Sequence, residues 1–317
     1  MATRDATVDL RGFLRNLLSL QYREVLMATA TLAVVAGAVL LFPGTENITA
    51  GLSADVGTTT IALFLVVAIA AGVVKGAAGF GYALVATPVF ASLIPNGTVA
   101  VVVLAIPPWM INVFQVGETN TGLEYVRREW ALIALSVVGA VVGVFFLAEF
   151  QKGPLVPFLI ALLLLGYVLF QVARRFVVVE EAHNPVALGS VGLLEGFLLA
   201  ATNLGPLLPA YLHTFERDRE RYVGGLSMVL GAIFTVRIVQ MAWVGLLTPY
   251  RLWLGCAIAV VTIVGLLAGT YLRRLGIDGE RFDYLVTALL FVIALNILSK
   301  TTGPALAKAD ELLALLF

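Results

Sequence analysis

A single arginine lies deep within a long apolar run in the second half of the chain. Arg237 stands about midway along residues 222–247, too far from either end for its side chain to reach water easily. An ionised group at that depth marks a binding site or a buried ion pair. Because the planar guanidinium suits oxyanions, we expect Arg237 to bind a small anion. A structural pair with Glu195 is the alternative.

Two short segments rich in glycine or proline interrupt apolar runs at corresponding places in the chain. The first reads Lys75-Gly-Ala-Ala-Gly-Phe-Gly-Tyr82 and the second Ala200-Ala-Thr-Asn-Leu-Gly-Pro206. A helix that restarts inside a membrane presents free backbone N–H groups and the positive end of its dipole, which favour an anion. Close helix packing at the glycines is the alternative. The binding residues expected at the breaks are Lys75, Gly76, Gly79, Gly81, Tyr82, Thr202, Asn203 and Gly205.

Polar residues in two further apolar runs correspond when the halves of the chain are aligned. Asn112 stands opposite Arg237 and Gln115 opposite Gln240, and a spacing of three places each pair on one face of a helix. We expect Asn112, Gln115 and Gln240 to bind the same ligand through hydrogen bonds, with bonding between helices as the alternative. Glu195 is expected to act as a proton carrier or as the counter-ion of Arg237, and both roles stay open.

Composition places these residues in a membrane protein. Of the 317 residues, 60% are hydrophobic and 13% charged, and the mean hydropathy is +0.99. A soluble chain of this length needs more charge to cover its surface. His183 and His213 lack metal-ligand spacing and Cys256 lies alone in an apolar run, so we expect no metal, cofactor or disulfide. The lack of clustered acids or histidines argues against an enzyme, and we expect no nucleic-acid partner.

The chain divides into two related halves. Ala71-Gly72 through Gly81 resembles Glu195-Gly196 through Gly205 at an offset of 124 residues, and later matches drift to 127. An ordered drift is typical of a diverged duplication. Each half is expected to contain a helix, a break and a second helix, at 58–75 and 82–94 and again at 186–201 and 207–215. Three long helices then follow in each half, at 98–116, 131–149 and 155–173 and at 222–247, 252–272 and 282–299.

Two glycine pairs in these long helices, Gly139 with Gly143 and Gly265 with Gly269, have the spacing of helix-packing faces, and we assign them no ligand. An amphipathic leader and an anchor helix at 25–42 occupy residues 1–57. The first repeat spans 58–175, the second 186–300, and a C-terminal tail 301–317.

Basic residues predict the orientation in the membrane. If the N-terminus is cytoplasmic and each broken pair enters and leaves on one side, fourteen of the twenty Lys and Arg residues lie inside. Four lie outside, namely Lys152, Arg251, Lys300 and Lys308, and the C-terminus is then also outside. Each half crosses an odd net number of times, so the halves have opposite orientation. We therefore expect an all-α polytopic membrane protein with two inverted repeats, each a broken or re-entrant helix pair plus three transmembrane helices.

The breaks and their flanks resemble those of the sulfite exporter TauE/SafE family, also called the 4-toluene sulfonate uptake permease family. The resemblance covers about 58–300, and Ala78 and Phe80 depart from the family's usual run of consecutive glycines. It implies export or uptake of sulfite, sulfoacetate or other organosulfonates, driven by an ion gradient. The residues that carry it are Ala71-Gly72, Gly76, Gly79, Gly81 and Thr87-Pro88, with a second copy at Glu195-Gly196, Asn203, Gly205 and Pro209.

These observations together predict a secondary transporter in the cell membrane that binds a small sulfur-containing anion at the midplane, between the two helix breaks. Its halves would rock about the site to give alternating access, with H⁺ as the candidate coupling ion. A passive anion channel and a carrier of another small anion are the alternatives. A carrier saturates and concentrates its substrate, whereas a channel does neither. The oligomeric state and the direction of transport stay open.

Overall fold

A computed structural model describes residues 22–49, 52, 57–78, 81–94, 97–119, 121–173, 185–215, 218–274 and 279–316, and the regular structure in this part of the chain is helical. The predicted amphipathic leader and Gly79 lie outside the described residues. The helices are α2 (Tyr22–Leu40), the 3-10 helix η1 (Thr45–Asn47), α3 (Thr58–Ala78), α4 (Tyr82–Leu93), α5 (Gly97–Val103), α6 (Ile106–Glu118), α7 (Leu123–Arg128), α8 (Trp130–Glu149), α9 (Leu155–Ala173), α10 (Pro185–Thr202), α11 (Leu207–Phe215), α12 (Arg219–Trp243), α13 (Pro249–Arg274) and α14 (Gly279–Leu316).

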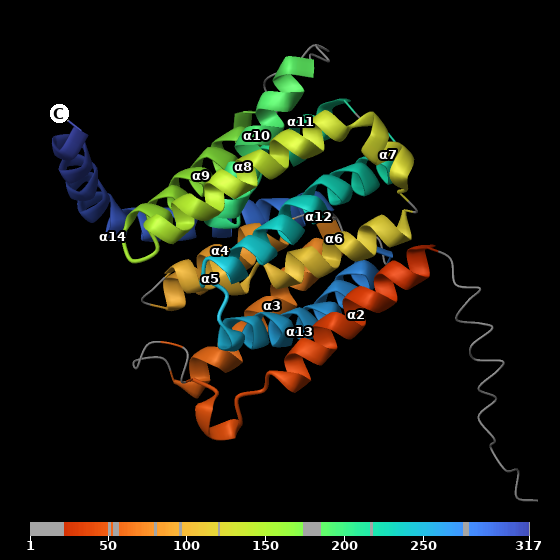
Figure 1. Cartoon of the computed structure of the whole chain (residues 1–317), viewed down its shortest axis with the longest axis horizontal. Helices are drawn as coiled ribbons and strands as arrows, with labels where there is room; N and C mark the ends of the chain where they lie inside the picture. The colour runs from red at the N-terminus through yellow and green to blue at the C-terminus, as the bar shows by residue number, and fades with distance from the viewer. Residues whose placement is uncertain are drawn as a thin grey trace, which may run out of the picture.

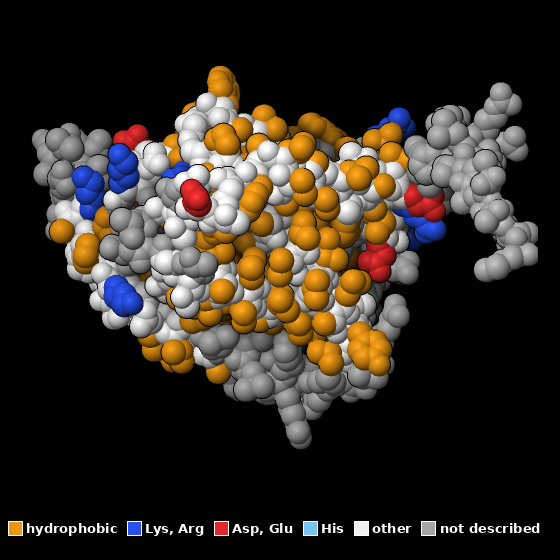
Figure 2. All heavy atoms as spheres, turned by 90° about the horizontal axis from the view of Figure 1, so that it is seen from below, with side chains coloured by type: hydrophobic (Ala, Val, Ile, Leu, Met, Phe, Trp, Pro, Cys, Tyr) orange, Lys and Arg blue, Asp and Glu red, His pale blue; other side chains and the backbone are white. Residues whose placement is uncertain are grey.

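Several of these helices have the length and composition of membrane spans. Within the described residues, seven apolar spans of 19 to 24 residues are long enough to cross a hydrocarbon core of about 30 Å. One of them, Gly97–Glu118, comprises α5 and α6 together. Large apolar side chains point outward, and Trp243 is 86% exposed. Figure 2 shows a face covered mainly by hydrophobic side chains, with charged side chains gathered toward its two ends. The predicted polytopic membrane protein is confirmed at this level.

Both predicted interruptions separate two helices. Between α3 and α4, Gly81 has a φ of 97°, which glycine adopts without a steric penalty. Between α10 and α11, Asn203 has a φ of 63°, in the left-handed region where asparagine is enriched among residues other than glycine. Residues 203–206 are not helical, so their backbone groups need partners from elsewhere in the protein.

Two helices differ from the sequence prediction. The single helix expected at 98–116 is two helices, α5 and α6, because Pro107 and Pro108 have no N–H to donate to the preceding turn. The helix expected to end at 299 continues in α14 to Leu316, so the expected C-terminal tail is largely helical. Pro304 lies inside α14, and the ribbon bends sharply near its C-terminal end (Figure 1).

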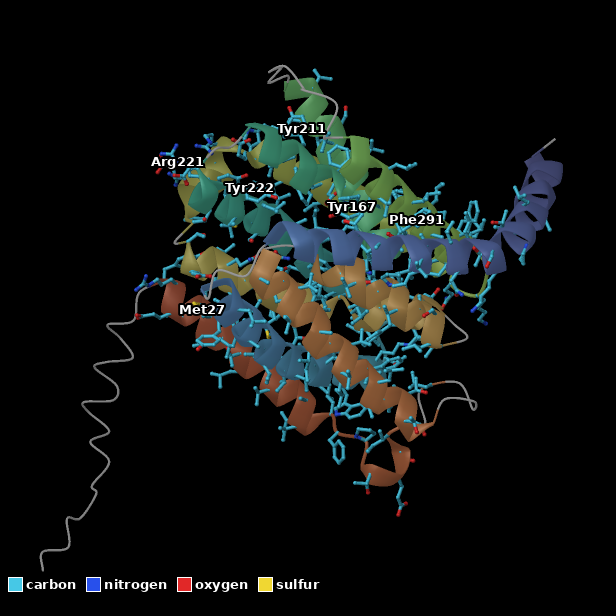
Figure 3. The ribbon with its side chains drawn as sticks, turned by 180° about the vertical axis from the view of Figure 1, so that it is seen from behind. Met27, Tyr167, Tyr211, Arg221, Tyr222 and Phe291 are labelled. Atoms are coloured by element: carbon cyan, nitrogen blue, oxygen red, sulfur yellow. The ribbon has the colours of Figure 1, made fainter. Side chains whose placement is uncertain are left out.

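Helices from the two halves are interleaved in space. In Figure 1, α8, α9, α10 and α11 lie on one side, α2, α3 and α13 lie on the other, and α6 and α12 lie between them. From behind, α14 crosses between these two groups, where it contacts α9, α4 and α3 (Figure 3). The first helix of each half therefore packs on the other half: α3 packs against α13, and α10 packs against α8.

Glycines line both of these contacts. An added methyl group at Gly139 would meet the backbone of α10, and one at Gly265 would meet the backbone of α3. The absence of side chains lets the helix backbones approach closely, so the predicted packing role of the two glycine pairs is confirmed. The glycines involved are Gly139, Gly143, Gly192 and Gly196 in the α8–α10 contact and Gly72, Gly76, Gly265 and Gly269 in the α3–α13 contact.

We expect Gly196→Leu to lower the yield of folded protein severely. A side chain there would overlap the backbone of α8 at Ser136, and overpacking of this kind costs about 1–3 kcal/mol or more. Size-exclusion chromatography of a tagged variant in detergent measures the effect. Gly166→Ala is the matched control, because no atom lies within 4 Å of a methyl group added in that part of α9. A monodisperse peak of wild-type height for Gly196→Leu would show that the helix contact tolerates wider spacing.

Candidate functional site

Arg237 lies on α12 with its side chain wholly inside the protein. The residue is 0% exposed. Its Nη1 donates to Oδ1 of Asn203 at 2.5 Å, and its Nη2 donates to the carbonyl oxygen of Val101 at 2.8 Å. The ring of Phe234, on the preceding turn, has its centroid 5.7 Å from the guanidinium carbon, where the π face attracts a cation. Nε is buried without a hydrogen-bond partner, so the guanidinium keeps donor capacity.

The interruption between α5 and α6 supplies the carbonyl groups at this site. The carbonyl of Val101 lacks its usual helical bond, because the amide that would donate to it turns to a neighbouring carbonyl. The carbonyl of Leu104 also lacks its helical donor, since the residue four positions later is Pro108, which has no N–H. Arg237 donates to the first of these oxygens, and Nδ2 of Asn203 donates to the second at 3.0 Å.

Asn203 joins several segments at the second helix break. Its Nδ2 also donates to Oγ1 of Thr87 on α4 at 2.9 Å, while its Oδ1 accepts from Arg237. An amide has both donor and acceptor atoms, and here each serves a different partner. The network therefore ties α4 and the α5–α6 break of the first half to the α10–α11 break and α12 of the second. Arg237 and Asn203, two of the predicted residues, share this cluster.

Sequence reasoning assigned no binding role to three members of the cluster, Thr87, Val101 and Leu104, although Thr87 was among the residues that carry the family resemblance. The last two contribute only backbone oxygens, which any residue type has. For Leu104 the available signal was Pro108, because a proline has no N–H to donate to the carbonyl four residues earlier.

Glu195 lies on α10, and it is fully buried but apart from Arg237. Within the described residues Arg237 makes no ion pair, so the alternative of a structural pair with Glu195 does not form. Oε2 of Glu195 accepts from the N–H of Leu207 at 2.9 Å, at the start of α11, and Oε1 is buried against Gly205 without a hydrogen-bond partner. A carboxylate of the protein itself thus occupies the helix N-terminus that was expected to face an anion.

Thr202 closes the end of α10. Its hydroxyl donates to the carbonyl of Leu198 at 2.7 Å and accepts from the N–H of Leu204 at 3.1 Å. These bonds satisfy backbone groups on both sides of the turn, which is the local reason that the helix stops here.

The two predicted polar pairs do not form one ring around Arg237. Oε1 of Gln115 accepts from the hydroxyl of Ser227 at 2.9 Å. Ser227 is ten residues from Arg237 on α12, or roughly 15 Å along the helix. Asn112 is buried against α12, and Nε2 of Gln240 donates to a backbone carbonyl of α8 at 3.0 Å. Gln115 and Gln240 therefore form hydrogen bonds between helices, which was the alternative to ligand binding.

Two residues at the first break, Gly76 and Tyr82, contact α13. The hydroxyl of Tyr82 lies 3.0 Å from that of Thr262, and Gly76 packs against the α13 backbone. Lys75 is half-buried in the last turn of α3, and Gly81 ends the break before α4. The Arg237 cluster draws its first-half contacts instead from Thr87 and from the α5–α6 break.

The chemistry available at the cluster is binding by a buried cation. Across the described residues, no group of three or more His, Cys, Asp or Glu side chains is placed to hold a metal ion. The guanidinium is fixed by two hydrogen bonds, retains an unpartnered Nε, and lies where two interrupted helices meet. Such an arrangement stabilises negative charge by position and by donated hydrogen bonds.

Comparison with known proteins places the chain in a family. A scan against protein-family models matches residues 63–297 to the family described as sulfite exporter TauE/SafE. Searches of curated proteins and of solved structures found no match. The matched region runs from α3 into α14 and includes both helix breaks and Arg237. The chain therefore belongs to the sulfite exporter TauE/SafE family, whose members are multi-pass membrane transporters of sulfite and related sulfur-containing anions and not enzymes.

Proposed function

We propose that this protein is a secondary transporter that binds sulfite or an organosulfonate beside Arg237. The observation that carries the proposal is the setting of the guanidinium, which is fully buried, pairs with no carboxylate of the described residues, and lies where two interrupted helices meet. Burying an uncompensated cation is costly, and a bound anion supplies the opposite charge. Family membership restricts that anion to the sulfur-containing class.

The guanidinium suits an anion with several oxygens on one sulfur atom. Each Nη donates one hydrogen bond to the protein and keeps a second N–H, and Nε–H has no protein partner. A planar fork of donors binds two oxygens of sulfite or a sulfonate side by side. The bonds to Asn203 and Val101 fix the fork beforehand, so less side-chain freedom is lost when the anion binds.

We further propose that residues 58–175 and 186–300 are inverted repeats, with the N-terminus cytoplasmic and the C-terminus outside. The distribution of basic residues supports the orientation, and the pattern of helix contacts supports the inverted repeats. α3 packs on α13, while its counterpart α10 packs on α8, the counterpart of α13. The corresponding helices α6 and α12 also contact each other, and Gln115–Ser227 and Trp109–Thr235 bonds fit an antiparallel pair. A two-fold axis in the membrane plane makes the α3–α13 contact equivalent to the α10–α8 contact, and it places the corresponding helices α6 and α12 side by side and antiparallel.

The same contacts suggest which parts move. Glycine packing joins α3 to α13 and α10 to α8, so a movement of one sequence half against the other would separate both contacts. A movement between the α3–α13 pair and the α8–α10 pair keeps both. The Arg237 cluster draws on α4, α5, α12 and the α10–α11 break, so we place the substrate between the two moving pairs.

Uptake of radiolabelled sulfite into proteoliposomes tests the proposal. We expect saturable uptake that exceeds the external concentration under an imposed ion gradient and that an excess of an alkanesulfonate inhibits. Protein-free vesicles measure the passive leak. Uptake that rises linearly with concentration and never exceeds the external level would identify a channel, and uptake no faster than the leak would overturn the substrate class.

A further inference from the structure

The carboxyl group of Glu195 is buried, and only one of its two oxygens has a hydrogen-bond partner. It is 0% exposed, Oε2 accepts the N–H of Leu207, and the N–H of Leu208 also bonds to the carboxyl group. Oε1 is buried, has no hydrogen-bond partner and lies against Gly205, where a larger residue would collide with it. Buried polar atoms are normally paired, so an unpaired carboxyl oxygen inside the protein requires an explanation.

The N–H groups that hold this carboxyl group lie at the N-terminus of a helix, where proteins commonly bind oxyanions. Leu207 and Leu208 begin α11, a helix of nine residues, and their N–H groups have no partner within the helix. Pro209 contributes no N–H, so these two amides are the donors at the very start of the helix. A sulfite or sulfonate oxygen and an ionised carboxylate oxygen present the same acceptor to a helix N-terminus.

We propose that Glu195 is a proton-binding site whose ionised carboxylate competes with the transported anion for the N-terminus of α11. This rests on the proposed transport of a small sulfur anion and adds its coupling chemistry. When a proton binds, the carboxylate becomes a neutral carboxylic acid, which loses its charge and gains an O–H donor. The amides of Leu207 and Leu208 then accept the substrate oxyanion in its place. One proton therefore enters the protein with each anion that occupies this subsite.

The helices packed against α10 carry the other ionisable groups of this region. From α12, Tyr222 lies near enough to interact electrostatically with Glu195, and its hydroxyl donates to the carbonyl of Pro209. α11 carries Tyr211 and His213, and α9 carries Tyr167. Figure 3 places Tyr211 and Tyr167 in the same part of the molecule as Tyr222. The only ionisable residue of α8 is Glu149, exposed at its end, and α5 has none. α12 also carries Arg219, Glu220 and Arg221 next to Tyr222, and Arg221 is exposed. Arg237, further along α12, bonds to Asn203.

The break between α10 and α11 links this proton site to the buried cation. Asn203, at its start, bonds to Arg237, and Gly205 and Leu207, near its end, contact Glu195. The four non-helical residues 203–206 therefore lie between the guanidinium of Arg237 and the carboxyl group of Glu195, whose negative charge is lost when a proton binds. At the corresponding position of the first half the residue is Ala71, so the proton site belongs to the second half alone.

The test compares proton movement with sulfite movement in the same vesicles. Proteoliposomes with an internal pH dye are loaded with radiolabelled sulfite from outside, with the membrane potential clamped at zero. Wild type should move one more proton per sulfite than Glu195→Gln. Protons bound to sulfite itself contribute equally to both measurements and therefore do not affect this difference. With one coupled proton on Glu195, wild-type accumulation should rise more steeply with the pH gradient than that of the variant, by about a further tenfold per pH unit, while the variant still exchanges sulfite at equal pH.

Two further variants keep the outcome decisive. Glu149→Gln removes an exposed carboxylate at the end of α8 and should match wild type. Leu207→Pro removes one contested N–H at the first position of α11, where proline fits a helix, and should weaken sulfite binding while keeping the fold. Equal proton counts in wild type and Glu195→Gln, or unchanged sulfite affinity in Leu207→Pro when Glu195→Gln does not fold, would overturn the inference and leave sulfite transport standing. No sulfite uptake by wild type would instead refute the proposed function.

Discussion

We expect Arg237→Ala to reduce the initial rate of sulfite uptake by about a hundredfold or more. A hydrogen bond to a charged group contributes about 1.5–3 kcal/mol, and about 1.4 kcal/mol corresponds to a factor of ten, so the loss of one such bond lowers the rate by about ten- to a hundredfold. The loss of the only fully buried cation among the described residues adds to it, because the anion would then enter the membrane interior without a compensating charge. Initial rates in proteoliposomes, normalised to the amount of folded protein, measure the effect.

Two matched variants separate binding from folding. Arg237→Lys keeps the charge, but an ammonium group cannot hold Asn203 and Val101 and still present a planar fork, so we expect weak residual uptake with a raised KM. Arg128→Ala removes an exposed arginine whose ion pair with Glu129 contributes little, and its uptake should equal that of wild type. Wild-type uptake by a folded Arg237→Ala protein would remove Arg237 from the binding site.

We expect Asn203→Asp to reduce uptake as strongly, but for a different reason. A carboxylate at this position lies within hydrogen-bond distance of the Arg237 guanidinium and forms a buried ion pair with it. The protein then supplies its own counter-charge, and a transported anion must displace it. The substitution also removes the Nδ2 donor from Thr87 and Leu104, so we expect uptake to fall by at least about a hundredfold and thermal stability to change modestly in either direction.

This substitution separates a binding role for Arg237 from a purely structural one. If Arg237 were structural only, an aspartate partner would be tolerated and uptake would persist. Asn47→Asp is the control, because Asn47 is exposed and its side chain bonds to a nearby backbone carbonyl. Sulfite uptake and melting temperature are measured for both variants. A folded Asn203→Asp protein with wild-type uptake would contradict an anion site at this cluster.

The membrane class and most helices could be predicted because they follow from local properties. A long apolar run that excludes charge must cross or lie in lipid, and glycine or proline clusters end helices wherever they occur. The same reasoning located Arg237, since the depth of a charge within an apolar run is visible in sequence. It also placed Asn203 at a break, although the left-handed backbone that lets it face Arg237 is known only from the structure.

The partners of these residues depend on tertiary geometry and could not be predicted. Arg237 and Glu195 look like an ion pair by charge alone, but residues 203–206 hold Glu195 at the start of α11 and Arg237 at the α5–α6 break. Gln115 matches Gln240 in the alignment of halves, yet each bonds to a different neighbour because α6 and α12 have different contacts along their lengths. The α5–α6 break itself was missed, since two prolines within a strongly apolar run were read as part of one span.

Because α3 packs on a helix of the other half, it is synthesised well before its packing partner α13. Tyr82 and Thr262, which join the first break to α13, are 180 residues apart in sequence. At about 5–20 residues per second, a ribosome needs roughly 10–40 s to synthesise the stretch between them. Throughout that interval the glycine face of α3 lies in the bilayer without α13 beside it. A chain that stops before α13 keeps that face unprotected, so nascent and truncated forms present quality-control proteases with a feature that the finished protein hides.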